Sequence, residues 1–265
     1  MTSPPVHELP PEWDRAFVRP PRALYHAEPP RSLVELAQFW AMFPTLAAGP
    51  RGEGQPVLVL PGFLAADGST TPLRALLQAR GYRAGAWGLG RNIGPTDHVL
   101  DGLSDRLVRL YEAYGRVSVV GWSLGGIYAR GLAHRHPSLV RQVVTLGSPF
   151  RVVGMDNTML THAGPAYDAL SPRHSPRVWL SDELNHAPPP VPSTAIFSRT
   201  DGVVPWRACL EFEGPRAESV EVPSSHCGLG HNVVAVAVVL DRLSQPDGEW
   251  RRLVPRGMTR LSRMH

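Results

Sequence analysis

Short apolar runs and segments of helical periodicity alternate along this chain from residue 56 onward. The run from Val57 to Leu60 ends abruptly at Pro61-Gly62, which is typical of a strand buried inside a parallel sheet. Further strands are expected at residues 82–87, 117–122, 142–146, 193–198 and 218–222, and helices at 71–80, 95–111 and 124–134. This alternation predicts the α/β class, a mostly parallel sheet with helices on both faces.

Two segments interrupt the alternation. Residues 149–190 contain several prolines and no strong strand pattern. We expect a small cap-like insertion there, over the carboxyl ends of the strands, where open α/β sheets bind ligands. The valine-rich segment 232–243 suits either a strand or a buried helix. The main domain is therefore expected to cover residues 55–245, with the cap insertion inside it.

The two ends of the chain are expected to stand apart from this domain. Residues 1–54 should form an arm and a helix, with the proline-rich first 30 residues extended. Ser32 and Glu35 have the spacing of a capping box, which predicts the start of that helix. Residues 246–265 are rich in arginine and are expected to form a solvated basic tail.

Composition excludes several functional classes. The net charge of +4 comes with neither a basic face nor a recognised module, so no nucleic-acid partner is expected. The longest apolar run, residues 233–240, is shorter than the roughly 20 residues that cross a bilayer. The N-terminus shows no cationic start followed by an apolar stretch, so a cytoplasmic location is expected. Contact with a membrane surface finds no support in the sequence.

One segment has the pattern of a catalytic motif. Gly121-Trp122-Ser123-Leu124-Gly125 lies between an expected strand and an expected helix. So sharp a turn strains the serine backbone and exposes its hydroxyl at the edge of the sheet, while the glycines let strand and helix approach closely. Ser123 is therefore predicted to be a nucleophile; the alternative is a tight turn that uses serine for its small size.

A nucleophilic serine needs a base, and on such a sheet an acid and then a histidine follow it along the chain. Asp201 comes directly after an expected strand and is the predicted acid; the alternative is a turn residue. Asp156 and Asp168 are weaker rivals because no strand precedes them. His226 follows the last expected strand and is the predicted base, whereas His231 falls at a helix start where capping or packing is commoner.

The loop after the first strand is predicted to complete the site. Gly62 lets that backbone approach a substrate, so the amides of Phe63 and Leu124 are predicted to form an oxyanion hole. No metal site is expected, since His134 and His136 are two apart on a helix end and face different directions. The residues expected to line the substrate site are Phe63, Leu64, Trp122, Phe150 and Val203.

Five segments resemble bacterial lipases and esterases of the α/β-hydrolase superfamily: Leu60-Pro61-Gly62-Phe63, Gly88-Leu89-Gly90-Arg91-Asn92, Gly121-Trp122-Ser123-Leu124-Gly125-Gly126, Ser198-Arg199-Thr200-Asp201-Gly202-Val203-Val204 and His226-Cys227-Gly228-Leu229-Gly230. The resemblance covers roughly residues 55–245. It implies that the catalytic histidine is His226 and not His231, and that segment 232–243 is a helix. It also implies cleavage of a small-molecule ester or lipid without a cofactor.

Several alternatives stay open in the sequence. The same three residues could serve an acyltransferase or a hydrolase of lactones or polyesters. The chain could also be a non-catalytic binding protein on this fold, but Ser123, Asp201 and His226 together argue against it. Cys209 and Cys227 could form a disulfide near the acid and base loops, although free thiols are the default in a reducing compartment. The natural ester, any lid movement and the number of subunits do not follow from the sequence.

Overall fold

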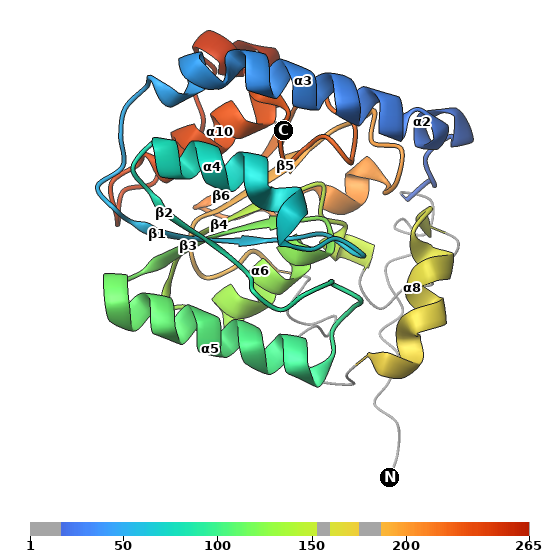
Figure 1. Cartoon of the computed structure of the whole chain (residues 1–265), viewed down its shortest axis with the longest axis horizontal. Coiled ribbons are helices and arrows are strands. Elements are labelled where there is room, and N and C mark those ends of the chain that lie inside the picture. Colours follow the sequence, from blue (N-terminus) through green and yellow to red (C-terminus); the bar gives the residue numbers. More distant parts are fainter. Residues whose placement is uncertain (1–16, 153–159, 175–186, 265) are drawn as a thin grey trace.

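A seven-stranded sheet with the order β2-β1-β3-β4-β5-β6-β7 forms the centre of the molecule (Figure 1). The computed structural model describes residues 17–152, 160–174 and 187–264. The first six strands are parallel, and β7 runs antiparallel to β6 at the edge. The strands are β1 (Pro56–Leu60), β2 (Arg83–Ala86), β3 (Val117–Trp122), β4 (Val140–Leu146), β5 (Ser193–Phe197), β6 (Ala217–Glu221) and β7 (Arg263–Met264). The predicted α/β class and the mostly parallel sheet are confirmed.

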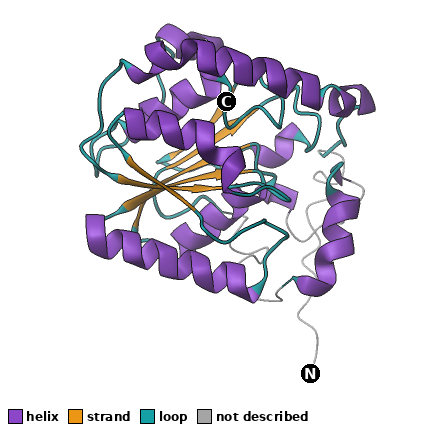
Figure 2. Cartoon of the chain, in the orientation of Figure 1, coloured by secondary structure: helices purple, strands orange, loops and turns teal. Residues whose placement is uncertain are grey.

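Helices cover both faces of this sheet (Figure 2). On one face lie α3 (Glu28–Ala47), α4 (Thr71–Ala79) and α10 (Val233–Leu243), and on the other lie α5 (Asp97–Tyr114) and α6 (Leu124–Arg135). The shorter helices are α2 (Arg22–His26), α8 (Gly164–Leu170), η1 (Asp67–Thr70), η2 (Phe150–Val152), η3 (Ser171–Arg173), η5 (Trp206–Cys209) and η6 (Gly257–Leu261).

Side-chain alternation along the strands divides the core in two. In β1, Val57 and Val59 pack with residues of α3, α4 and α10, whereas Leu58 and Leu60 pack with residues of α5 and α6. Every residue of β1 and of β4 is buried. In β1, burial on both faces leaves no polar side to break the apolar run, which is why this strand could be predicted from the sequence.

The N-terminal helix begins earlier than the capping-box spacing predicted. Helix α3 starts at Glu28, and prolines occupy its first turn, where a missing N–H costs nothing. Ser32 lies one turn inside the helix, so the predicted capping box is wrong. The proline-rich segment is also not extended throughout, since α2 covers Arg22–His26. Residues 1–16 lie outside the described part of the chain.

The C-terminal segment was predicted as a solvated basic tail; most of residues 246–264 are exposed, but the segment is anchored to the sheet. The N–H of Leu253, a buried residue, donates to Glu218 Oε2 at 2.9 Å, and β7 pairs with β6. The segment therefore closes the edge of the sheet. The ambiguous segment 232–243 is helix α10, as the resemblance implied, and the side chain of Asn232 caps its first turn.

Candidate active site

Ser123 lies where β3 turns directly into α6, in the conformation that the motif predicts. Its φ is +53°, and a non-glycine residue there stores about 1–3 kcal/mol of strain. Two backbone hydrogen bonds hold the turn: Ser123 N–H donates to Leu146 O at 2.8 Å, and Gly126 N–H donates to Ser123 O at 2.9 Å. The side chain is half-buried at the end of the sheet, with the first N–H groups of α6 beside it.

The glycines around the serine are required by close packing. A Cβ atom on Gly125 would lie 2.5 Å from Leu60 O, and one on Gly121 would overlap the backbone of α6. A Cβ atom on Gly62 would lie 3.2 Å from Ser123 Cβ. The loop after β1 therefore runs directly against the serine, as the sequence predicted.

A buried asparagine fastens that loop. Asn92 is fully buried; its Nδ2 donates to Pro61 O at 2.9 Å, and its Oδ1 accepts from Tyr128 Oη at 3.1 Å. Its backbone also pairs with the loop, since Leu64 N–H donates to Asn92 O at 2.7 Å. Leu64 has a φ of +60°, a strained conformation that this bond helps to hold. Asn92 belongs to one of the five segments that resemble bacterial lipases and esterases, but no role was predicted for it from the sequence.

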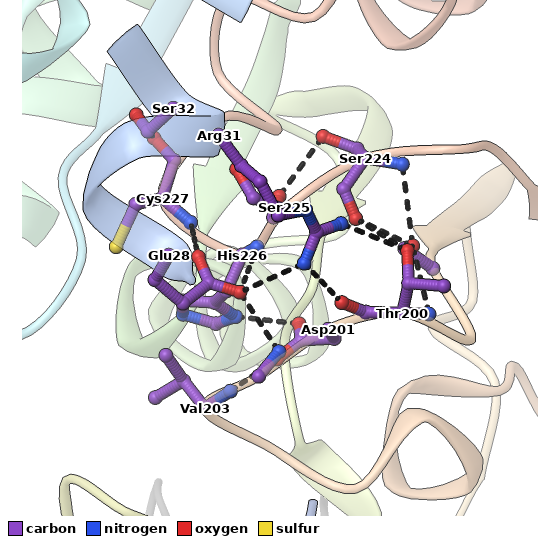
Figure 3. A network of polar contacts seen from close by, with 12 residues as sticks. Glu28, Arg31, Ser32, Thr200, Asp201, Val203, Ser224, Ser225, His226 and Cys227 are labelled. Atoms are coloured by element: carbon purple, nitrogen blue, oxygen red, sulfur yellow. Dashed lines mark hydrogen bonds and ion pairs between the residues drawn. The ribbon is translucent and has the colours of Figure 1, made fainter. Parts of the chain in front are cut away.

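His226 and Asp201 form a buried pair at the same edge of the sheet (Figure 3). The distance between His226 Nδ1 and Asp201 Oδ2 is 2.6 Å. The other oxygen of Asp201 accepts hydrogen bonds from the N–H groups of Val203 and Val204, each at 2.8 Å. The carboxylate is thus fixed by its own turn and can orient the imidazole.

The electrostatics of the pair favour a charged imidazole. Burial lowers the pKa of His226, but the charge of Asp201, its hydrogen bond and the charge of Glu28 outweigh burial and raise that pKa above its ordinary value. A base whose pKa is raised in this way accepts a proton more readily than free histidine does.

The end of β4 connects this pair with the serine. A Cβ atom on Gly147 would lie 3.2 Å from His226 Nδ1 and 3.3 Å from Asp201 Oδ2. The preceding residue, Leu146, accepts the backbone hydrogen bond of Ser123. Trp122 adds a second link, because its Nε1 donates to His226 O at 3.0 Å. The three predicted residues therefore lie at the same edge of the sheet.

Two glutamates on α3 also reach this edge, and the sequence analysis missed them. Glu28 accepts hydrogen bonds from the backbone of both loops of the His–Asp pair, and Glu35 accepts from Ser225 N–H at 2.9 Å. Glu35 had been assigned to a capping box instead. The signal that could have indicated the true helix start is Pro29-Pro30, since proline favours the first turn of a helix.

Two of the predicted lining residues lie beside the serine loop. Phe63 is partly buried, and its ring makes an edge contact with Tyr167 of α8 at 5.4 Å between centroids. Leu64 is exposed. Helix α8, from the predicted cap insertion, therefore covers the loop after β1; residues 153–159 and 175–186 of that insertion lie outside the described residues.

The other three predicted lining residues contact neighbouring parts of the fold. Phe150 has no exposed surface and packs under the guanidinium of Arg130 at 3.9 Å, so its assignment to the substrate site is corrected. The indole of Trp122 supports the His226 loop through its bond to His226 O. Val203 is partly buried and packs against the cluster that contains Phe197.

The weaker candidates lie elsewhere or fall outside the described residues. His231 Nε2 lies 3.1 Å from Ser32 O, which links it to α3, and burial lowers its pKa. Asp168 is exposed on α8, and Asp156 lies outside the described residues. Cys209 and Cys227 are free thiols, so the disulfide alternative is excluded.

The described residues contain no group of three or more histidine, cysteine or acidic side chains that could hold a metal ion. Within the same part of the chain, no helix is both long enough and apolar enough to span a membrane.

Comparison with known proteins agrees with this geometry. No known family profile matches the sequence. A pimeloyl-[acyl-carrier protein] methyl ester esterase of Shewanella woodyi is 34% identical over 98 residues, so the match spans only 37% of each chain. A Bacillus licheniformis lipase in propeptide form superposes with a TM-score of 0.54 at 15% identity, covering 78% of this chain and 54% of the lipase.

A second solved structure is matched over almost its whole length. The pyrethroid hydrolase of Sphingobium faniae JZ-2 superposes with a TM-score of 0.51 at 20% identity, over 72% of this chain and 98% of that protein. The chain has the α/β-hydrolase fold. Ser123 lies in the turn between β3 and α6. On this fold, a nucleophilic serine is expected in such a strand-to-helix turn.

Proposed function

We propose that this protein is a serine hydrolase of carboxylic esters, similar in action to esterases and lipases. The observation that carries the proposal is the buried His226–Asp201 pair, at 2.6 Å, beside a serine in the strained turn of an α/β-hydrolase fold. The local similarity to a methyl ester esterase supports the same reaction class.

In the first half of the reaction, Ser123 Oγ attacks the ester carbonyl carbon and His226 Nε2 takes the hydroxyl proton. The carbonyl oxygen becomes an oxyanion, which the backbone N–H groups of Phe63 and Leu124 would bind. Collapse of this intermediate breaks the bond to the alcohol oxygen. His226 gives its proton to that oxygen, the alcohol leaves, and the acyl group stays on Ser123.

The second half repeats the chemistry with water. His226 takes a proton from water as its oxygen attacks the acyl carbon, and the bond to Ser123 then breaks. The serine recovers its proton from His226 and the carboxylic acid is released. Asp201 holds the Nδ1 proton of His226 throughout and stabilises the imidazolium. No cofactor takes part in these steps.

The surroundings of Ser123 favour an apolar acyl group. Phe63, Leu64 and Tyr167 lie at or near the loop beside the serine, and none of the three carries a charge at neutral pH. Burial raises the pKa of Tyr167 to about 12, with a smaller contribution from Asp168, so its hydroxyl stays protonated. We therefore propose an ester or lipid of small molecular size as substrate.

A series of p-nitrophenyl esters from short to long acyl chains tests the proposal, with a fluorophosphonate probe to label the nucleophile. We expect hydrolysis and labelling of Ser123, and the best chain length separates an esterase from a lipase. Acyl-enzyme that turns over only after addition of an alcohol or amine would identify an acyltransferase instead. Absence of both hydrolysis and labelling would contradict the proposal.

Activity is expected to fall on the acid side of a pKa above about 6.5, the ordinary histidine value. Only neutral His226 can accept the serine proton, and His226 is neutral at pH values above its pKa. Asp201 and Glu28 raise that pKa. Lowering the pH through this pKa therefore removes the base. The pH profile of kcat/KM for a short p-nitrophenyl ester measures it. An acid limb centred below the ordinary value would contradict the expectation.

Replacing Asn92 should impair the loop beside the serine. In Asn92→Ala, Pro61 O loses its partner, which should reduce stability by about 1–3 kcal/mol. A misplacement of the loop by 1 Å would lower kcat by up to about 10²-fold, with less effect on KM. Gln78→Ala is the matched control, since Gln78 Nε2 also donates to a backbone oxygen, that of Ala84, away from the site. If kcat is equal in both folded variants, Asn92 does not hold the loop.

A further inference from the structure

The first residue of α3 contacts both loops that carry the His–Asp pair (Figure 3). Glu28 is 2% exposed, and its Oε1 accepts from Gly202 N–H at 2.8 Å and from His226 N–H at 3.0 Å. Its Oε2 accepts from Cys227 N–H at 2.8 Å. One side chain thus binds the residue after Asp201 and the backbone of the base itself.

Hydrogen-bond donors and a cation surround both oxygens of Glu28. The three backbone N–H groups all donate to it, and the Arg31 guanidinium lies 3.8 Å from Oε1. An ionised carboxylate accepts hydrogen bonds at both oxygens and has no proton to place among these donors. Arg31 also donates to Thr200 O at 2.7 Å, so the same turn of α3 fixes the residue before Asp201.

We infer that Glu28 is a positioning residue for the reaction: its carboxylate holds the Asp201 and His226 loops in register and adds a second negative charge behind the imidazole. The expected effect of Glu28 on catalysis rests on the proposed function. The Glu28 carboxylate accepts from backbone N–H groups, so it acts through the backbone of His226. Hydrogen bonds from buried backbone N–H groups to a charged acceptor are stronger than neutral ones, so the carboxylate suits this task.

Few other charged or titratable groups face His226. Asp201 faces it from the loop after β5 and Glu28 faces it from α3. Cys227 follows it in the chain as an exposed residue; partial desolvation of its thiol, followed by Glu28, raises the thiol pKa to about 12, so the thiol stays neutral. Glu35, two turns along α3, binds Ser225 and the side chain of Asn232 instead.

Glu28→Gln tests the inference, because it keeps the size of the side chain and removes the charge. The His226 imidazole is titrated by NMR in the full-length protein labelled at histidine nitrogen, with its signal assigned through His226→Ala. We expect its pKa to fall in Glu28→Gln, and the amide protons of His226 and Cys227 to exchange faster. The acid limb of kcat/KM should move to lower pH, with a loss in kcat larger than the change in KM.

Two variants separate positioning from simple loss of stability. Glu35→Gln lies on the same helix, is similarly buried and binds the same loop, so it should lose stability but leave the His226 pKa near that of the wild type. Glu28→Asp keeps the charge on a shorter side chain and should retain much of the pKa while losing part of kcat. An unchanged His226 pKa in folded Glu28→Gln, or an equal fall in Glu35→Gln, overturns the inference. Failure of the proposed function appears separately, as a wild type without ester hydrolysis, and the NMR titration still tests Glu28 in that case.

Discussion

Ser123→Ala is expected to lower kcat for ester hydrolysis by about 10⁶-fold, the scale at which loss of the nucleophile leaves only binding and oxyanion contacts. The substitution removes the atom that forms the acyl-enzyme, and no neighbouring group replaces it. The backbone at position 123 keeps its two hydrogen bonds, so the fold should survive. Alanine cannot relieve the strain at φ +53°, and the stability should change little.

The measurement is the single-turnover rate with a p-nitrophenyl ester, together with labelling by a fluorophosphonate. Ser118→Ala is the matched control, because Ser118 is a buried serine on the strand that leads to Ser123, and its hydroxyl accepts from Gln142 Nε2 at 3.4 Å. It should keep full activity and labelling. Residual hydrolysis in Ser123→Ala within tenfold of the wild type would show that another group is the nucleophile.

Asp201→Asn is expected to lower kcat by about 10⁴-fold while leaving the geometry nearly intact. In the wild type the carboxylate accepts the Nδ1 proton of His226, which leaves Nε2 free to accept the serine proton. An asparagine can present its amide N–H to Nδ1 instead and so place the imidazole proton on Nε2. The base is then in the wrong tautomer. The loss should appear in kcat, with KM changed much less.

Steady-state kinetics and thermal unfolding of Asp201→Asn check this expectation. Asp67→Asn provides the matched control: Asp67 also accepts from two backbone N–H groups, those of Trp87 and Gly88, but in the described part of the chain its carboxylate has no hydrogen bond to a histidine. Loss of stability should be similar in the two variants, and loss of activity confined to Asp201→Asn. Equal kinetic losses in Asp201→Asn and Asp67→Asn would mean that Asp201 only stabilises the turn in which it lies.

The sheet and the serine turn could be predicted from sequence because their signals are local. Every residue of β1 is buried, and the glycines around Ser123 are required by backbone contacts within and next to the turn. The pairing of Asp201 with His226 followed from chain order, since parallel strands end at the same edge. The roles of these residues in catalysis stay predictions until the variants are measured.

The residues that hold the loops of the site in place could not be predicted, because the residues they bind are distant in sequence. Glu28 and Glu35 have the pattern of helix-surface residues, and only the packing of α3 against the loops shows their contacts. Asn92 binds the loop after β1 from 31 residues away. Phe150 was predicted to line the substrate site, whereas it is buried against Arg130, an arginine whose place in the core no local pattern indicates.

The contact between Glu28 and His226 also has a consequence for biosynthesis. The two residues are 198 positions apart, and ribosomes add about 5–20 residues per second, so Glu28 waits on the order of 10–40 s for its partner to be made. Throughout that interval the helix has no His226 loop to hold, and the base has not been synthesised. A nascent chain therefore carries a serine but no assembled active site. The proposed reaction therefore requires the loop that carries His226 to be synthesised and to close onto α3.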